Sequence, residues 1–227
     1  MFLVLYVDDI LLIGNDIPML EVVKTSLRKC FSMKDLGEAA YILGIRIYSD
    51  RSKRLIGLSQ DTYIDKILKW FDMQDSKKGF LPMSQGITLG KTQCPMTPDE
   101  QERMREIPYA SAVGSIMYAM LCTHLDVSYA LSVTSRYQSN FSETHWTTVK
   151  SILMYLRRTK DVFLVFGGED ELSVRGYTDA SFQTDKDDSR LQLGFVFCLN
   201  GGGSELEKFQ ARDSSRFDDR SRVYCSF

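Results

Sequence analysis

The sequence lacks the residue patterns on which disulfide frameworks and histidine-rich metal sites depend. It has only two histidines, His124 and His145, and its five cysteines show no Cys-x-x-Cys spacing. This pattern favours free thiols in a reducing compartment over a disulfide framework or a zinc site. No sign of charge dominates either, because 28 basic residues stand against 30 acidic ones, for a net charge of -2. Contact with nucleic acid would therefore depend on a local basic patch.

Apolar runs of membrane-spanning length are also missing, since charged or polar residues interrupt each run. The first residues are apolar, but no basic segment precedes them, which argues against a signal peptide. We therefore expect no membrane span and a cytoplasmic or nuclear location. With 227 residues and 44% hydrophobic content, the chain can build one sizeable core or two small ones.

The opening stretch "FLVLYVDDILLIG" places two adjacent aspartates between two apolar runs. Residues 2–7 and 10–13 are rich in β-branched and aromatic side chains, which favours a hairpin with Asp8 and Asp9 at its tip. Asn15 or Asp16 then caps a helix that has Pro18 in its first turn.

Strands and helices succeed one another through the rest of the chain. The pattern predicts strands at residues 41–48 and 55–58, a helix at 62–71, a proline-containing surface connection at 76–108 and three helices within 109–159. Strands return after Gly167-Gly168. Residues 203–227 show neither strand alternation nor a helical stripe, and we expect them to be disordered.

Three interpretations of the aspartate pair remain open from the residues alone. The first is a solvated hairpin tip, because aspartate is common in turns. The second is a receiver-like signalling domain, although the apolar strand that follows at once counts against it. The third is a two-metal nucleotidyl-transfer site, in which convergent carboxylates hold cations about 4 Å apart. That third site needs a further carboxylate from another strand.

The stretch "LYVDDILLIGND" resembles the Tyr-x-Asp-Asp motif of reverse transcriptases, here as YVDD. The text that follows resembles the Pol polyprotein of copia-type LTR retrotransposons, especially those of plants. The matching segments, in family order, are "FSMKDLGEAAYILGIRI", "LSQDTYIDKIL", "MQDSKKG", "PYASAVGSIMYAMLCT", "SRYQSN", "HWTTVKSILMYLRRTKD" and "GYTDASF". The resemblance extends to about Gly202.

This resemblance implies an RNA-directed DNA polymerase coupled to ribonuclease H, with an α+β fold. The implied parts are a partial palm (residues 1–58), a thumb helix (59–75), a surface connection (76–108), a helical thumb and connection region (109–166) and the first ribonuclease H strands (167–202). In the parent protein the partners are an RNA or DNA template-primer and a dNTP, and the cofactor is Mg²⁺ in a two-metal site.

The resemblance also assigns site residues. Asp8 and Asp9 would be catalytic metal ligands of the palm, and Asp179 in "GYTDAS" would be the first metal ligand of ribonuclease H. Contacts to nucleic acid are implied for eight residues: Tyr6, Leu43, Gly44, Lys66, Lys69, Arg157, Arg158 and Lys160. For the lysines and arginines, a solvated helix face or a basic helix C-terminus is the competing interpretation. His145 and Trp146 match the family as well, but we assign them to helix packing.

The departures from the family pattern are equally informative. The fingers and the earlier palm strand, which would carry the third carboxylate, do not precede Asp8, and the later ribonuclease H ligands do not follow Asp179. His124-Leu125 stands where the family has Arg-Pro, and Phe141 stands where proline is usual. The tail "GSELEKFQARDSSRFDDRSRVYC" resembles a shifted-frame reading of the family's "ADSTTEAEYIA" region, so we predict a frameshift near Gly202. We expect the chain alone to be inactive, with a non-catalytic nucleic-acid-binding relic as the alternative.

Overall fold

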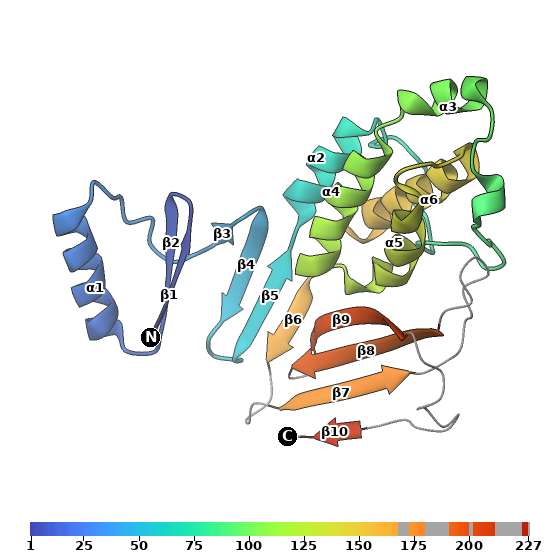
Figure 1. The fold of residues 1–227 in the computed structure, drawn as a ribbon. Helices are drawn as coiled ribbons and strands as arrows, with labels where there is room; N and C mark the ends of the chain where they lie inside the picture. The colour runs from blue at the N-terminus through green and yellow to red at the C-terminus, as the bar shows by residue number, and fades with distance from the viewer. Residues whose placement is uncertain (168–172, 180–190, 200–201, 212–223, 227) are drawn as a thin grey trace. The chain divides into compact units, whose positions relative to one another are not determined.

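The computed structural model describes residues 1–167, 173–179, 191–199, 202–211 and 224–226. These residues form a mixed α+β fold, as expected (Figure 1). The chain divides into two compact units, Met1–Ile42 and Leu43–Phe227. The boundary between the two units falls within residues 1–58, and the assignment of that segment to a palm stays a prediction.

The first unit contains a hairpin, one helix and a short strand. Strands β1 (Phe2–Tyr6) and β2 (Asp9–Ile13) pair antiparallel, helix α1 (Ile17–Cys30) follows, and β3 (Tyr41–Ile42) ends the unit. The Asp16 carboxylate accepts a hydrogen bond from the Met19 backbone at 3.1 Å. The predicted cap and the early proline are thus confirmed, because both fit the unsatisfied donors of a first helical turn.

The hairpin tip differs from our prediction by one residue. Tyr6 pairs directly with Asp9, so the two-residue turn consists of Val7 and Asp8, and Asp9 is the first residue of β2. The prediction that Asp8 and Asp9 together form the tip is wrong. The apolar run includes Val7, but the pairing register leaves that residue in the turn.

The second unit contains an antiparallel sheet built from distant parts of the chain. Strand β4 (Ile45–Asp50) pairs with β5 (Leu55–Ser59), and β5 pairs with β6 (Leu164–Gly167). We predicted a continuous strand at 41–48, but Leu43 and Gly44 form a turn there. We also missed β6, because its four residues follow a long helical pattern directly.

Four helices supply the hydrophobic core of this unit: α2 (Asp61–Trp70), α4 (Tyr109–Cys122), α5 (Ser128–Thr134) and α6 (Glu143–Thr159). Short 3₁₀ turns at Leu125–Val127 (η2) and Ser135–Tyr137 (η3) connect them. The predicted helices at 62–71 and within 109–159 are confirmed. The buried apolar residues at their interfaces include Ile64, Ile67, Leu68, Tyr109, Val113, Ile116, Leu131, Val149, Ile152, Leu153 and Leu156.

The proline-containing connection is more ordered than we expected. It holds a 3₁₀ turn at Lys91–Gln93 (η1) and a helix, α3 (Pro98–Arg105). Thr97 and Glu100 form a reciprocal capping box at the start of α3. The sequence Thr-Pro-Asp-Glu carries this signal, with a cap residue, proline at the first helical position and glutamate at the third.

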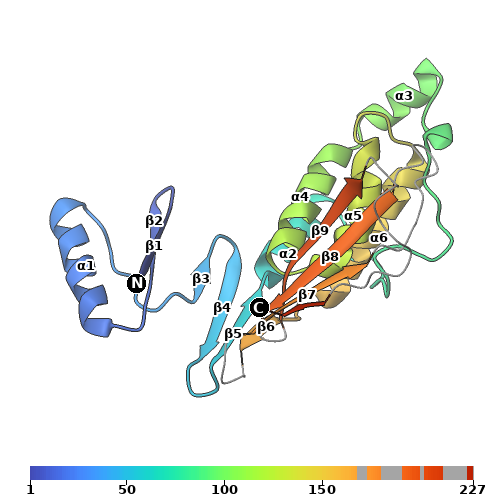
Figure 2. The same cartoon turned by 60° about the horizontal axis from the view of Figure 1, so that its bottom comes forward.

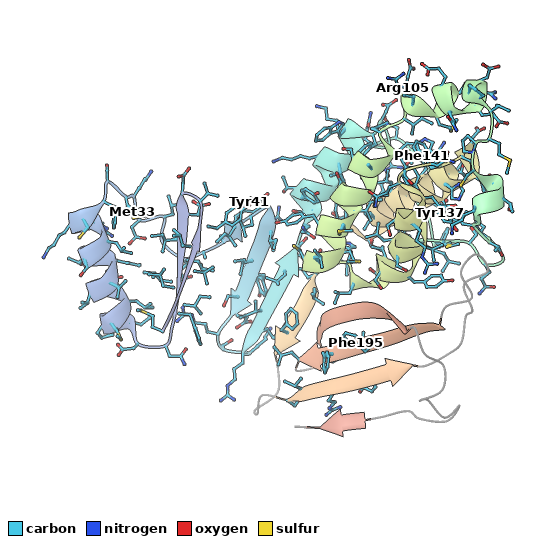
Figure 3. All side chains as sticks on the ribbon, in the orientation of Figure 1. Met33, Tyr41, Arg105, Tyr137, Phe141 and Phe195 are labelled. Carbon is cyan, nitrogen blue, oxygen red and sulfur yellow. The ribbon has the colours of Figure 1, made fainter. Side chains whose placement is uncertain are left out.

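Two residues near the start of α6, Phe141 and His145, have packing roles; Figure 3 labels Phe141 and Tyr137 among the helices of this unit. Phe141 stacks on Tyr109 with ring centroids 4.2 Å apart. His145 is fully buried, lies 4.1 Å from the Tyr137 ring, and accepts a hydrogen bond from the Ser142 backbone at 3.1 Å. These contacts agree with our assignment of His145 to packing.

The remaining strands form a second sheet in the order β10-β7-β8-β9 (Figure 1), and Figure 2 shows β7, β8 and β9 from another side. Its members are β7 (Val174–Asp179), β8 (Leu191–Leu199), β9 (Gly202–Ala211) and β10 (Tyr224–Ser226). Our prediction of disorder is wrong for the parts of the tail in β9 and β10. Strand β9 pairs antiparallel with β8, with a register shift between Phe197 and Cys198. Residues 212–223 and 227 lie outside the described part.

In the described residues, no helix combines the length and the apolar character needed to cross a bilayer.

Candidate functional site

The hairpin of the first unit brings Asp8 and Asp9 to one end of a two-stranded ribbon. Asp9 lies directly opposite Tyr6, so these two side chains share a face of the hairpin, while Asp8 belongs to the turn. Both aspartates are exposed. The arrangement presents two adjacent carboxylates at an accessible tip, next to an aromatic hydroxyl.

The turn that carries Asp8 is strained at the residue before it. Val7 has a φ of +49°, whereas Asp8 does not have a positive φ. A positive φ at only the first of two turn residues is the type II′ pattern, which normally has glycine there. For a β-branched residue this conformation is an outlier that costs about 1–3 kcal/mol. Such strain is concentrated at functional sites.

The ribbon behind the tip is apolar on both faces. Leu3 and Leu5 point to one side, and Val4 and Tyr6 to the other; between 48% and 65% of the surface of each is exposed. Strands that are apolar on both faces are typical of sheets covered on both sides. Among the described residues, no cluster of three or more His, Cys, Asp or Glu side chains could hold a metal ion.

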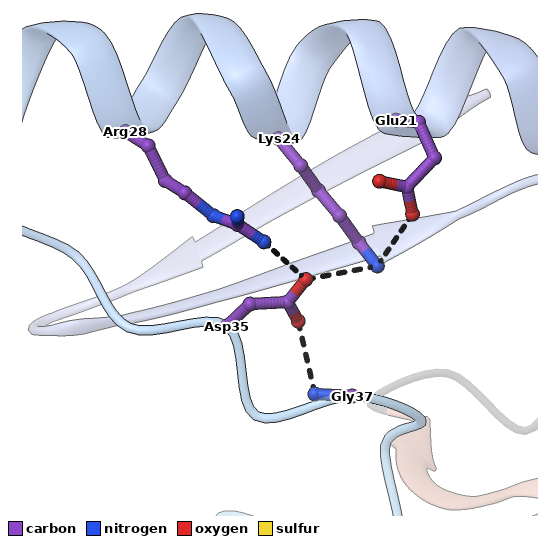
Figure 4. Close-up of polar contacts among 5 residues, drawn as sticks. All are labelled: Glu21, Lys24, Arg28, Asp35 and Gly37. Atoms are coloured by element: carbon purple, nitrogen blue, oxygen red, sulfur yellow. Dashed lines mark hydrogen bonds and ion pairs between the residues drawn. The ribbon is translucent and has the colours of Figure 1, made fainter.

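A charged network holds the segment after α1 against that helix (Figure 4). The Asp35 carboxylate is 2.7 Å from Arg28 and 3.3 Å from Lys24, and it accepts a hydrogen bond from the Gly37 backbone at 2.9 Å. Lys24 also contacts Glu21 at 3.1 Å. The Gly37 hydrogen bond and the cations lower the pKa of Asp35, and the bonds to Glu21 and Asp35 raise the pKa of Lys24.

The turn at Leu43 and Gly44 is supported by aromatic side chains of two helices. Both residues have positive φ, +53° and +76°, the type I′ pattern of tight turns. The Tyr118 hydroxyl of α4 donates a hydrogen bond to the Leu43 carbonyl. Tyr63 of α2 contacts the Tyr118 ring edge-on at 4.9 Å and donates a hydrogen bond to the Ser115 carbonyl at 3.0 Å. The turn is therefore held in place from α2 and α4.

The basic candidates lie on two neighbouring helices. Lys66 and Lys69 are on the exposed side of α2, and Arg157 and Arg158 are in the last turn of α6. Lys160 differs from these four. Its ammonium is 2.7 Å from Asp65 of α2, and the contact raises the pKa of Lys160. The structure thus gives Lys160 a helix-pairing role, while its contact with phosphate stays a prediction.

Asp179 is the last residue of β7, opposite Gly194 of β8. The predicted position at a strand end is confirmed. Its role as a metal ligand stays a prediction.

Sequence reasoning missed two features of these sites. The strain at Val7 depends on the pairing register, which a hydrophobic pattern specifies only to within a residue. The support of Leu43 by Tyr118 joins residues 75 positions apart. No local signal marks such a contact, since Tyr118 reads as one more residue of an amphipathic helix.

The chain matches one family model over residues 1–85 and several proteins over most of its length. A family model described as "Reverse transcriptase (RNA-dependent DNA polymerase)" matches residues 1–85. The Pol polyprotein of transposon TNT 1-94 from Nicotiana tabacum is 43% identical over 210 residues, which cover 91% of this chain and 16% of that protein.

Two Arabidopsis thaliana proteins match as well. The Pol polyprotein of transposon RE2 is 30% identical over 224 residues, or 97% of this chain and 15% of that protein. An uncharacterized mitochondrial protein is 32% identical over 202 residues, or 88% of this chain and 79% of that protein. No solved structure matches the chain. The chain thus spans about a sixth of the length of the two Pol polyproteins.

Proposed function

The chain belongs to the reverse transcriptase family as part of a copia-type Pol polyprotein, and on that premise we propose that Asp8 and Asp9 are carboxylate ligands of its polymerase site. The observation that carries the proposal is the exposed tip, where adjacent carboxylates follow a strained residue. The parent protein would copy an RNA or DNA template-primer with dNTPs.

The donor set fits Mg²⁺. This ion prefers oxygen ligands and is usually held by one or two carboxylates together with substrate phosphates and water. Asp8 and Asp9 supply such a pair. When bound, the metal ions would neutralise phosphate charge and orient the attacking and leaving oxygens.

Two further sets of residues would position the nucleic acid, Tyr6 in the first unit and the Leu43-Gly44 turn in the second. Tyr6 shares the face of Asp9 and would contact the primer or the incoming nucleotide. The Leu43-Gly44 turn would support the primer end, and its fixed backbone suits that task because Tyr118 holds the Leu43 carbonyl. In this scheme residues 1–58 belong to the palm.

The helical parts would bind the duplex. Residues 59–75 and 109–166 would form thumb and connection, joined by the surface segment 76–108. Lys66, Lys69, Arg157 and Arg158 would meet phosphates from the adjacent helices α2 and α6. Of these cations, Lys66, Lys69 and Arg158 are exposed, which also favours the second candidate function, a non-catalytic protein that binds nucleic acid.

Residues 167–202 would begin a ribonuclease H-like sheet, with Asp179 as its first metal ligand. The support is the place of Asp179 at the end of a strand in an antiparallel sheet. A strand end is where a carboxylate can reach a metal without burial inside the sheet.

Mn²⁺ binding, measured by electron paramagnetic resonance, tests the polymerase site directly. We expect Asp8→Asn and Asp9→Asn each to weaken binding by about tenfold or more, because each removes a charged ligand. The matched control is Asp99→Asn, from another adjacent acidic pair, whose partner Glu100 already accepts hydrogen bonds from Met96 and Thr97. Equal binding by all variants would contradict the proposal.

We also propose that these 227 residues alone do not polymerise. A two-metal site needs more carboxylates than the pair at this tip, and the described residues bring no third one to it. A primer-extension assay with Mg²⁺ should show no product. Template-dependent synthesis that disappears on Asp8→Ala would overturn this proposal.

A further inference from the structure

The segment that follows α2 returns along α6 and presents one aromatic ring to solvent. The Gly79 backbone N–H donates a hydrogen bond to the Met154 carbonyl at 2.9 Å. A Cβ at Gly79 would lie 3.0 Å from the Tyr155 nitrogen, so only glycine fits this approach without a shift. The segment is therefore fixed against the last two turns of α6.

This docking sets the Phe80 ring over a cation. The Arg158 guanidinium carbon lies 4.0 Å from the centre of the Phe80 ring, within the range of a cation–π contact. Yet 74% of the Phe80 surface stays exposed. The Phe80 ring thus contacts Arg158 and still has most of its surface in water. A second flat group can stack on that exposed surface.

The surroundings of the ring carry positive charge. Residues 65–80 and 157–161 contain seven basic and four acidic side chains, a net charge of +3, in a chain whose overall charge is -2. The Asp65–Lys160 ion pair joins these two stretches across α2 and α6. The positive charge is thus local, and part of it comes from Lys77 and Lys78 in the segment that leads to Phe80.

We propose that Phe80, held over Arg158, is a stacking platform for a nucleobase of single-stranded nucleic acid. Aromatic rings between cations that track a phosphate backbone are the usual means of binding single strands without sequence preference. Arginine suits both tasks, because its flat guanidinium packs on a ring and its N–H donors pair with phosphate. The inference rests on the proposed contact of α2 and α6 with nucleic acid, and adds the base-binding element.

Fluorescence anisotropy with two labelled oligomers of equal length tests the inference. One is oligodeoxythymidylate, longer than the sites of about 4–16 nucleotides usual for single-strand binding folds; the other is the same backbone without bases. We expect the full chain to bind the first more tightly. Phe80→Ala should lower that affinity about fivefold or more and leave binding of the abasic oligomer unchanged.

Three further variants separate stacking from charge and folding. Arg158→Lys keeps the charge and loses the flat support, so it should weaken binding of the base-containing oligomer alone. Tyr48→Ala, which removes a ring that is 56% exposed on β4, should change neither affinity. Phe80→Trp should bind at least as well as the natural chain. Because Phe80 is exposed, its alanine variant should keep the melting temperature of the natural chain.

Each other outcome overturns the inference. Equal binding of the two oligomers, equal binding by Phe80→Ala, or no binding at all would mean that Phe80 is not a base platform, and would point to a surface that a polypeptide covers. If Phe80 does not bind bases but Asp8 and Asp9 bind Mn²⁺ as expected, the inference about Phe80 fails and the proposed polymerase site is still supported.

Discussion

The two units of this chain bury their apolar residues to very different extents. In Met1–Ile42, none of the residues is buried, although the hairpin is almost entirely apolar. In the second unit, the helical core excludes water from Ile64, Ile116 and Ile152 completely. In both units, the helices and most of the strands lie where their hydrophobic patterns predict them. The difference shows that a pattern predicts an element reliably, whereas burial depends on what the element packs against.

Leucine truncation should give the largest contrast between the units. Leu68→Ala removes a side chain that is 1% exposed, and we expect a loss of about 2–5 kcal/mol in the free energy of unfolding. Leu5→Ala also truncates a leucine, but 65% of the surface of Leu5 is exposed. This variant should change the free energy of unfolding by about 0.5 kcal/mol or less. Urea denaturation followed by circular dichroism measures both. A large loss for Leu5→Ala would show that the hairpin is covered in solution.

Two glycines with positive φ give a second, smaller contrast. Gly167 ends β6 with a φ of +109°, and a Cβ there would lie 1.9 Å from the Arg54 carbonyl oxygen. Gly167→Ala should therefore cost about 1–3 kcal/mol or more, because backbone must move. Gly37, with a φ of +81°, has open space around it, so Gly37→Ala should cost only the conformational strain of about 1 kcal/mol.

Urea denaturation of Gly167→Ala, Gly37→Ala and the natural chain measures the loss in the free energy of unfolding for each variant. Equal losses for the two variants would mean that the contact of β6 with the turn at Arg54 does not constrain the fold.

Acid should affect the two units in different pH ranges. Burial lowers the pKa of His124, against the opposing effects of Asp126 and the Thr159 carbonyl. Around this pKa, the folded state binds fewer protons than the unfolded state. The contribution of neutral His124 to the free energy of unfolding is therefore complete above the unfolded pKa of about 6.5, and it is lost as the pH drops below that value. The Asp35 pKa is also lowered, but its contribution is complete above the unfolded pKa of about 3.9 and is lost at lower pH.

Residue-resolved NMR during a pH titration distinguishes the two ranges. Signals of α4 and α6 should respond below about pH 6.5, and His124→Gln should remove that response. Signals of α1 and of the segment at Asp35 should change only below about pH 4. A single common transition would contradict the independent titrations.

The sequence predicted well those features that depend on local chemistry. The cap at Asp16, the amphipathic stripe of α2 and the three helices after Tyr109 each follow from a few neighbouring residues. The failures involve pairing over distance. The strands β6 and β9 depend on β5 and β8, and the register of β1 with β2 moved the turn by one residue.

The candidate site shows the same division. The sequence motif was sufficient to select Asp8 and Asp9 as candidate metal ligands, and it also predicted that Asp179 lies near the end of a strand. The cation–π contact of Phe80 with Arg158 could not be foreseen, because it joins residues 78 positions apart through the close approach at Gly79. The frameshift hypothesis for the tail is a question for the nucleotide sequence: restoring the frame near Gly202 should yield "STTEAEY"-like text.

The pairing of β5 with β6 also has a consequence for the order in which this protein folds. Ile56 finds its partner in Phe166, so the ribosome makes every helix of the core before the sheet can close. Until then the outer edge of β5 carries unpaired backbone groups, which are a template for pairing with other chains. Closing so long a loop is slow. A nascent chain that stalls before residue 164 would therefore expose an open β-edge and be prone to aggregate.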